Sequence, residues 1–208
     1  MNTKLETVTG MLVDIQNPDA STISIDDIAW GLSRLPRFCG QTITTVPYNV
    51  AQHSIFVMNE VQAMIASSHP VLTQLPSFVA GINNQRARNE LLLKALLHDA
   101  AEAYTGDWPS PVKRLPVIAD TIKEIEDRLL FAIYDMCNLT ELTDDERHII
   151  KYADKIAQKI EAYAFMPSRG LNWIGLPSVT LEQLQSFPAP ETAWVSYNMF
   201  LEKYKELT

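Results

Sequence analysis

The stretch RNELLLKALLHDAAEAY, residues 88–104, decides the fold class of this chain. Wound as a helix it is apolar almost all round, which predicts a helix buried at the centre of a bundle. Gly106 stands just past its end, where a left-handed residue commonly terminates a helix, and Pro109 prevents continuation. His98 and Asp99 interrupt the apolar run, and two such polar groups in a core require partners from elsewhere in the chain.

Helical spacing of apolar residues also dominates the rest of the chain. Ser24 is placed to cap one helix, with Asp27 assisting as its third residue. Thr143 and Glu146 stand in capping-box register before another. Besides the central helix, the predicted helices cover residues 24–35, 49–66, 118–137, 144–165 and 191–207. The expected fold is all-α, a single-domain helical bundle over residues 1–208, with a short β-prone N-terminal segment at MLVDI.

The composition limits the class of protein. With 208 residues, 47% of them hydrophobic, the chain can bury a full core. Its net charge of −8 disfavours stable binding to the backbone of a nucleic acid. The two cysteines disfavour a disulfide framework and fit a reducing compartment. The polar N-terminus and the absence of a bilayer-length apolar run indicate a cytoplasmic protein with no membrane partner.

Four side chains that can bind a metal fall on faces that periodicity assigns to the core: His53, His98, Asp99 and Asp154. Burying a lone carboxylate is costly, so two carboxylates and two imidazoles from three helices suggest a cation between them. This N/O set suits a borderline divalent ion such as Zn, Co, Fe, Ni or Mn. The alternative is that each histidine is a satisfied core residue and that Asp154 pairs with a lysine of its own helix.

Four segments of the chain carry a resemblance to a known family. They are LSRLPRFCGQT (32–42), YNVAQHS (48–54), LLHDAAEAYTGDWPSPVK (96–113) and ADKI (153–156). Together they resemble the HD-domain phosphohydrolases, and within these the small branch of bacterial 5′-deoxynucleotidases and phage deoxynucleoside triphosphohydrolases. The resemblance runs from about residue 10 to 165 and implies a bundle of the HD-domain type.

The resemblance implies a metal site and an acid/base. His53, His98, Asp99 and Asp154 match the ligands of one divalent ion per chain. Dinuclear members have further histidines before the last aspartate, where this chain has only His148. That residue precedes Asp154 by six positions and points in a different direction on a helix, which favours one metal.

Glu102 matches the family's catalytic acid/base, which orients the attacking water. Four positions after His98, it would share a helical face with that histidine. The alternative is an exposed glutamate at a helix end, where the dipole disfavours it. Asp107 and the turn of Trp108, Pro109 and Ser110 match positions that contact the substrate. Asp107 could equally hydrogen-bond its own turn.

Arg37 and Phe38 resemble an arginine-aromatic pair that reaches the phosphate and the base of the substrate. Arg37 would also offset charge that develops on the phosphoryl oxygens. Arg34 competes for that role. Without the resemblance, Arg37 would be interpreted as a charged surface residue and Phe38 as a hydrophobic core residue. Lys113 either adds positive potential to the site or is a solvated lysine.

The implied activity is metal-dependent hydrolysis of deoxynucleotides at the 5′-phosphate ester. The segments RFCGQT and AQHS look more like phage members, so the main expectation is a dATP triphosphohydrolase, in the host cytoplasm if phage-encoded. The alternatives are a 5′-deoxynucleotidase acting on monophosphates, a phosphodiesterase or alarmone hydrolase, and a catalytically silent nucleotide-binding module. Family members oligomerise, so a homo-oligomer is expected, and the closing helix either covers the core or mediates self-association.

Overall fold

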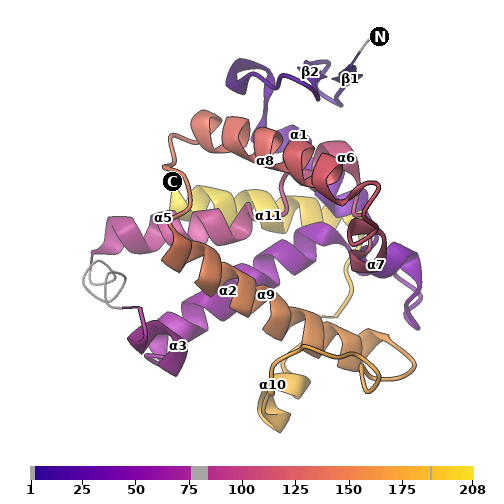
Figure 1. Ribbon diagram of the computed structural model, residues 1–208, viewed down its shortest axis with the longest axis vertical. Coiled ribbons are helices and arrows are strands. Elements are labelled where there is room, and N and C mark those ends of the chain that lie inside the picture. The colour runs from indigo at the N-terminus through magenta and orange to yellow at the C-terminus, as the bar shows by residue number, and fades with distance from the viewer. Residues whose placement is uncertain (1–2, 76–83, 188) are drawn as a thin grey trace.

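The computed structural model describes residues 3–75, 84–187 and 189–208, which are mostly helical (Figure 1). The longer helices are α1 (Ile25–Arg34), α2 (Val50–Ala66), α5 (Gln85–Leu96), α8 (Ala119–Met136), α9 (Asp144–Phe165) and α11 (Ala193–Leu207). The short ones are η1 (Ala20–Thr22), η2 (Arg37–Gly40), α3 (Pro70–Thr73), α6 (Glu102–Thr105), α7 (Ser110–Lys113) and α10 (Leu181–Gln185). Strand β1 (Lys4–Glu6) pairs antiparallel with β2 (Leu12–Asp14). The all-α fold class and the short N-terminal β segment are thereby confirmed.

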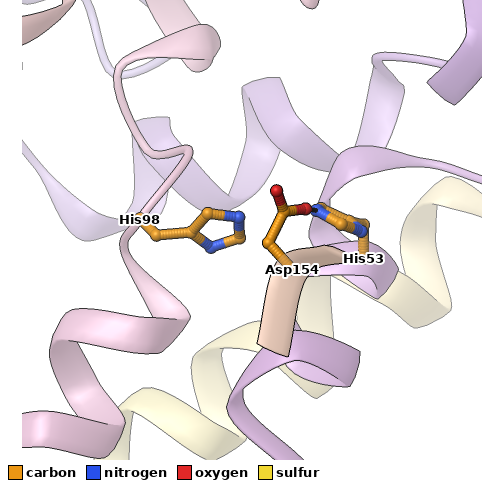
Figure 2. Close-up of side chains that lie close together, drawn as sticks. All are labelled: His53, His98 and Asp154. Atoms are coloured by element: carbon orange, nitrogen blue, oxygen red, sulfur yellow. Dashed lines mark ion pairs between the residues drawn. The ribbon is translucent and has the colours of Figure 1, made fainter. Parts of the chain in front are cut away.

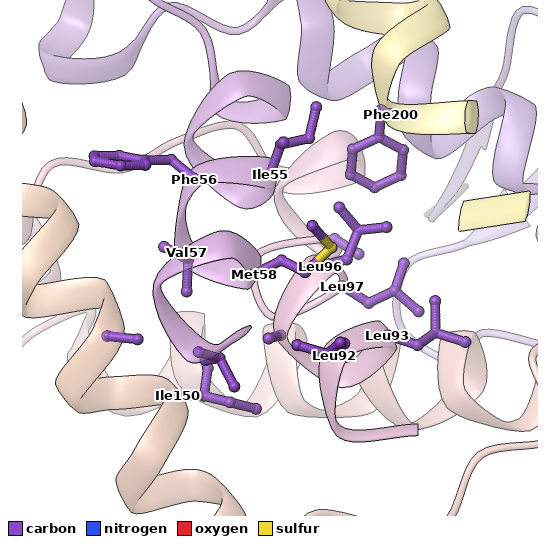
Figure 3. Close-up of a cluster of buried hydrophobic side chains, with 14 of the residues drawn as sticks. Ile55, Phe56, Val57, Met58, Leu92, Leu93, Leu96, Leu97, Ile150 and Phe200 are labelled. Atoms are coloured by element: carbon purple, nitrogen blue, oxygen red, sulfur yellow. The ribbon is translucent and has the colours of Figure 1, made fainter. Parts of the chain in front are cut away.

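The hydrophobic core lies where α2, α5, α9 and α11 approach one another (Figure 3). Helix α2 contacts both α5 and α9, and α11 contacts α1, α2 and α5. Val57, Leu96 and Phe200 have no exposed surface. Burying a side chain of this kind contributes about 1.5–3 kcal/mol relative to leaving it in water. Because these contacts fix α2 against α5 and α9, they also fix the side chains that the three segments carry toward a common centre.

The central helix ends earlier than the sequence predicts. The apolar pattern predicts one helix through Tyr104, whereas α5 ends at Leu96 and His98 and Asp99 lie in a turn before α6. The ring of His98 donates its Nδ1 proton to the carbonyl of Ala95 at 2.8 Å. In a continuing α-helix that carbonyl would instead accept the amide of Asp99. The expected one-turn relation between His98 and Glu102 on a single helix is therefore wrong.

The predicted helix caps are present, with one correction. Ser24 caps α1 through its side chain, and Thr143 and Glu146 form both bonds of a capping box before α9. Asp27 does not assist the cap of α1. Its carboxylate accepts the amide of Thr9 at 3.0 Å and the hydroxyl of Thr9 at 2.8 Å. It thereby ties the N-terminal β segment to α1.

The closing helix α11 covers the core with one face. Phe200 and Ser196 are fully buried, and Ser196 accepts a hydrogen bond from the Asn49 amide at 2.9 Å. Trp194, on the same helix, is 60% exposed. Self-association through α11 stays a prediction. Among the described residues, no helix combines the length and the apolar character needed to cross a membrane.

Candidate metal centre and active site

Two histidines and an aspartate from three separate segments converge at one place. His53 of α2, His98 of the turn after α5 and Asp154 of α9 each offer a ligand atom, and these atoms lie within 4.8 Å of one another (Figure 2). Nε2 of His53 is 3.2 Å from Oδ1 of Asp154. His53 has no exposed surface, while the side chain of Asp154 is 36% exposed. The group is therefore anchored in the core on one side and open on the other.

Asp99, the fourth expected ligand, lies beside this group. Its Oδ2 is 3.2 Å from Nε2 of His98 and 3.5 Å from Nε2 of His53. Burial alone would raise the pKa of Asp99, but His98, His53 and Arg37 lower it well below its usual range. Asp99 therefore remains ionised and adds negative charge at the point where the two imidazoles meet.

The imidazole nitrogens that face the centre of the group have no hydrogen-bond partner. Nδ1 of His98 is used by the Ala95 carbonyl, and Nδ1 of His53 lies 2.7 Å from Oε1 of Glu161. The Nε2 atoms of both rings are buried and make no hydrogen bond among the described residues. Nδ1 bonds of this kind leave the Nε2 lone pair available to a metal.

The electrostatics around His53 also favour a cation. Burial and Arg37 favour the neutral ring, but Glu161 and Asp154 outweigh them and raise the pKa of His53 to about 10. The carboxylates thus stabilise positive charge at this position, as a divalent ion would require. The donor types, the two inward-facing Nε2 atoms and the surrounding negative charge all fit a divalent metal ion, which would take the place of the proton on Nε2 of His53.

Glu161 is a site residue that the sequence interpretation missed. It lies on α9, has no exposed surface and accepts the hydrogen bond of His53 across 108 positions in the chain. Its other oxygen, Oε2, is 3.7 Å from Nη2 of Arg37. A sequence signal does exist, because Glu161 follows Asp154 by seven positions and so lies on the same apolar face of α9.

Arg37 lies at the buried end of the site and is not a surface charge. It is only 9% exposed. Its guanidinium is 3.6 Å from Asp107, 3.8 Å from Asp99 and 3.7 Å from Glu161. Arg34, its competitor in the sequence interpretation, is exposed and lies over a tryptophan ring of its own helix. Of the two arginines, Arg37 is the one the fold brings to the metal group.

Glu102 is buried beside a lysine and is not an exposed helix end. It is 3% exposed, and its Oε1 accepts a hydrogen bond from Nζ of Lys113 at 2.8 Å. Burial first, and then Asp99 and Asp107, raise its pKa well above the usual value, against the effect of Lys113. Lys113 also pairs with Glu126 at 2.9 Å, so it is not a free surface lysine. Oε2 of Glu102 is buried without a hydrogen-bond partner, which leaves it available to a bound molecule.

A cavity of about 690 Å³ opens next to these groups. The remaining expected substrate residues, Phe38 and the Asp107–Ser110 turn, line this cavity. A loop after α9, to which the sequence interpretation gave no role, lines it as well. Its lining consists of Arg37, Phe38, Asp99, Glu102, Asp107, Trp108, Pro109, Ser110, Pro111, Lys113, Arg114, Lys151, Asp154, Lys155, Gln158, Met166, Asn172, Trp173, Ile174 and Leu176. The volume falls within the range of small-molecule sites.

Most of the sequence matches a protein family. A family described as 5′-deoxynucleotidase YfbR-like matches residues 31–204. The chain belongs to this family. The matched range contains all four expected metal ligands as well as Arg37 and Glu102. Membership confirms the resemblance to the HD-domain phosphohydrolases and makes the chain a hydrolase of that group.

Individual relatives are also similar to the chain, and two of the three described next are named 5′-deoxynucleotidases. The chain is 34% identical to an uncharacterised protein of Rhodobacter capsulatus over 74% of this chain and 69% of the relative. It is 31% identical to the 5′-deoxynucleotidase PM0747 of Pasteurella multocida, over 55% of this chain and 60% of the relative. It is 30% identical to the 5′-deoxynucleotidase YfbR of Salmonella paratyphi B, over 65% of this chain and 69% of the relative.

The YfbR-like family is metal-dependent and acts on small deoxynucleotides, and this chain has a candidate His/Asp metal site. The names of the relatives do not confirm the main sequence expectation, a deoxynucleoside triphosphate triphosphohydrolase that favours dATP. They favour the alternative, a 5′-deoxynucleotidase. Phage origin and the homo-oligomer stay predictions.

Proposed function

We propose that this protein hydrolyses the 5′-phosphate ester of 2′-deoxynucleoside monophosphates with the aid of one divalent metal ion. Water and the ester yield a deoxynucleoside and orthophosphate. The observation that carries the proposal is the meeting of a carboxylate with two imidazole nitrogens that make no hydrogen bond, next to a buried arginine. The family description and the relatives' names support the monophosphate as substrate.

His53, His98, Asp99 and Asp154 would hold the ion. A bound divalent ion supplies polarisation of the phosphoryl group and lowers the pKa of water. The mixed nitrogen and oxygen donors suit Zn, Co, Mn, Fe or Ni better than an all-oxygen ion such as Ca. Only His148 offers a further histidine between Asp99 and Asp154, and it is exposed, which supports one ion per chain.

Glu102 acts as the acid/base of the reaction. Its free oxygen Oε2 orients the attacking water toward phosphorus, while Lys113 holds Oε1 at 2.8 Å and fixes the carboxyl in one rotamer. Because Glu102 is buried, this proton acceptor works away from competing bulk water.

Arg37 binds the phosphate and stabilises the charge on its oxygens. Asp99, Asp107 and Glu161 hold the guanidinium in place from three sides. An arginine fixed in this way needs no reorganisation when the substrate arrives. The Asp107–Ser110 turn lines the adjoining part of the cavity and contacts the sugar.

A second candidate substrate, the deoxynucleoside triphosphate, is favoured by three cations at the cavity. Arg114, Lys151 and Lys155 line it in addition to Arg37 and Lys113. Cations placed beyond the first phosphate would neutralise the two further phosphates of a triphosphate. Hydrolysis of dATP to deoxynucleoside and triphosphate is therefore the second candidate function.

Product analysis separates the two candidates. The metal-free protein is loaded in turn with Co²⁺, Mn²⁺ and Zn²⁺ and incubated with the four deoxynucleoside monophosphates and the four triphosphates. We expect orthophosphate and deoxynucleoside from the monophosphates. Tripolyphosphate released from dATP, with the monophosphates untouched, would establish the second candidate instead. Turnover of cyclic or 3′-pyrophosphorylated nucleotides without 5′-phosphate cleavage would contradict both.

A further inference from the structure

The loop between α9 and α10 forms one wall of the active-site cavity. Met166, Asn172, Trp173, Ile174 and Leu176 all line it. Ile174 is 96% exposed, so this wall presents apolar surface to solvent. Apolar side chains gathered at a cavity are more often a binding surface than scattered exposed residues are.

Trp173 of this loop contacts Phe38, which is far from it in the sequence. The ring centroids lie 5.6 Å apart with an angle of 65° between the planes. Both side chains are half-buried and both line the cavity. Edge-to-face geometry is one of the arrangements that aromatic rings prefer, so rings of this kind can also pack against a further aromatic group.

The backbone at Phe38 is held in a costly conformation. Phe38 has φ 55° and ψ 31°, and Cys39 follows with φ 53° and ψ 29°. Two successive non-glycine residues in the left-handed region are unusual, and such strain concentrates at ligand sites. The turn places Phe38 in the cavity while the preceding residue, Arg37, faces the buried carboxylates.

Both aromatic residues are attached to the same part of the scaffold. The Arg37 amide donates to the Tyr48 carbonyl at 2.8 Å, and the Tyr48 ring lies 4.7 Å from that of Phe165. Phe165 ends α9, directly before the loop that carries Trp173. The segments that carry the two rings therefore both begin at this packed part of the core.

The arrangement matches the two ends of a nucleotide. Arg37 and the metal group lie at the buried end, where a phosphate would bind. The Phe38 ring lies next to Arg37, with 5.4 Å between Cζ and the ring centroid, and Trp173 contacts Phe38. We infer that Trp173 contacts the nucleobase and forms with Phe38 an aromatic subsite for it. This inference rests on the proposed function, because it needs a nucleotide whose phosphate is bound at Arg37.

The test compares a substrate that has a base with one that lacks it. For wild type, Trp173→Ala and Trp173→Phe, kcat/KM is measured with dAMP and with 2-deoxyribose 5-phosphate, and the binding of dAMP is measured by calorimetry. We expect the ratio of kcat/KM for dAMP to that for 2-deoxyribose 5-phosphate to fall about tenfold in Trp173→Ala, since stacking of one base is worth roughly that factor. Trp173→Phe restores most of the ratio, because the ring face is kept.

Trp194→Ala is the matched control. Trp194 lies on α11, is 60% exposed and stacks on Tyr197 at 5.5 Å, away from the residues that line the cavity. The ratio stays at the wild-type value in this variant. An equal loss on both substrates in Trp173→Ala would show that Trp173 only holds the loop, and would overturn the inference. Wild-type protein that neither binds nor cleaves a deoxynucleotide would overturn the proposed function, and the inference with it.

Discussion

The buried and open ends of the active-site cavity are built in different ways. At the buried end, His53, Glu161 and Arg37 are at most 9% exposed and are joined to one another by hydrogen bonds or ion pairs. At the open end, Lys151 and Arg114 are exposed side chains. At the buried end, His53 lies on α2, Glu161 on α9 and Arg37 on the short helix η2. At the open end, Lys151 lies on α9, but Trp108, Arg114 and Trp173 lie outside the helices.

This difference assigns the chemical step to the buried end and the selection of the substrate to the open end. Groups fixed by a packed core keep the geometry that metal binding and phosphoryl transfer require. Groups on loops can vary without disturbing that geometry. Substitutions at the buried end should therefore lower activity on every substrate to a similar extent, while those at the open end should change which substrate is preferred.

The largest effect of a single catalytic substitution is expected at Glu102. Glu102→Gln keeps the shape of the side chain and an oxygen that can accept the hydrogen bond from Lys113, but it removes the acid/base. We therefore expect kcat to fall about 100-fold or more while the metal content is unchanged. Glu124→Gln, an exposed glutamate of α8, is the control and keeps wild-type kcat. A kcat within a factor of two of wild type in Glu102→Gln, measured by phosphate release, would rule out its assigned role.

Glu161→Gln tests whether the buried end depends on its carboxylate. The glutamine amide cannot hold the His53 ring as a carboxylate does, so metal affinity falls about 10- to 100-fold. Calorimetric titration of metal-free protein with Mn²⁺ measures this, and thermal melting of the metal-free variant checks that it folds. Glu202→Gln, on the exposed side of α11, serves as the comparison. Unaltered Mn²⁺ affinity in a folded Glu161→Gln protein would mean that the hydrogen bond does not support the site.

The two neighbouring arginines provide a matched pair. Arg37→Lys keeps the charge but loses the planar fork, so kcat/KM falls about tenfold, as expected for one lost hydrogen bond to a charged group. Arg34→Lys makes the same change in an exposed side chain that lies over its own helix, and leaves kcat/KM unchanged. The reverse order of the two variants would assign phosphate binding to Arg34.

The smallest effect is expected at the open end. Lys151→Gln removes an exposed charge and lowers kcat/KM for dATP roughly threefold, with less change for dAMP. Lys205→Gln on α11, outside the cavity lining, changes neither value. An equal decrease for dAMP and dATP would show that this lysine does not distinguish phosphate chains.

The sequence predicts the helices of the buried end well because each is specified locally. Apolar periodicity locates α2 and α9, and the pair of Thr143 and Glu146 marks the start of α9. The same periodicity carries His53 and Asp154 toward the core, which is why both could be named in advance.

Features that apolar periodicity does not encode could not be predicted in this way. The end of α5 depends on a side-chain bond from His98 to a backbone carbonyl, which competes with a helix that the apolar pattern favours. The role of Glu161 depends on a contact 108 positions away. Trp173 lies in a loop without periodicity, so only the folded chain brings it to Phe38.

The central claim is that His53, His98, Asp99 and Asp154 bind one divalent ion. The most direct test is the stoichiometry of Co²⁺ bound to metal-free wild type, Asp154→Asn and His148→Gln, followed by the visible absorption of the bound ion. We predict one Co²⁺ per chain in wild type and in His148→Gln, which alters an exposed histidine of the same helix, and none in Asp154→Asn at equal protein concentration. Wild-type stoichiometry and spectrum in Asp154→Asn would contradict the account.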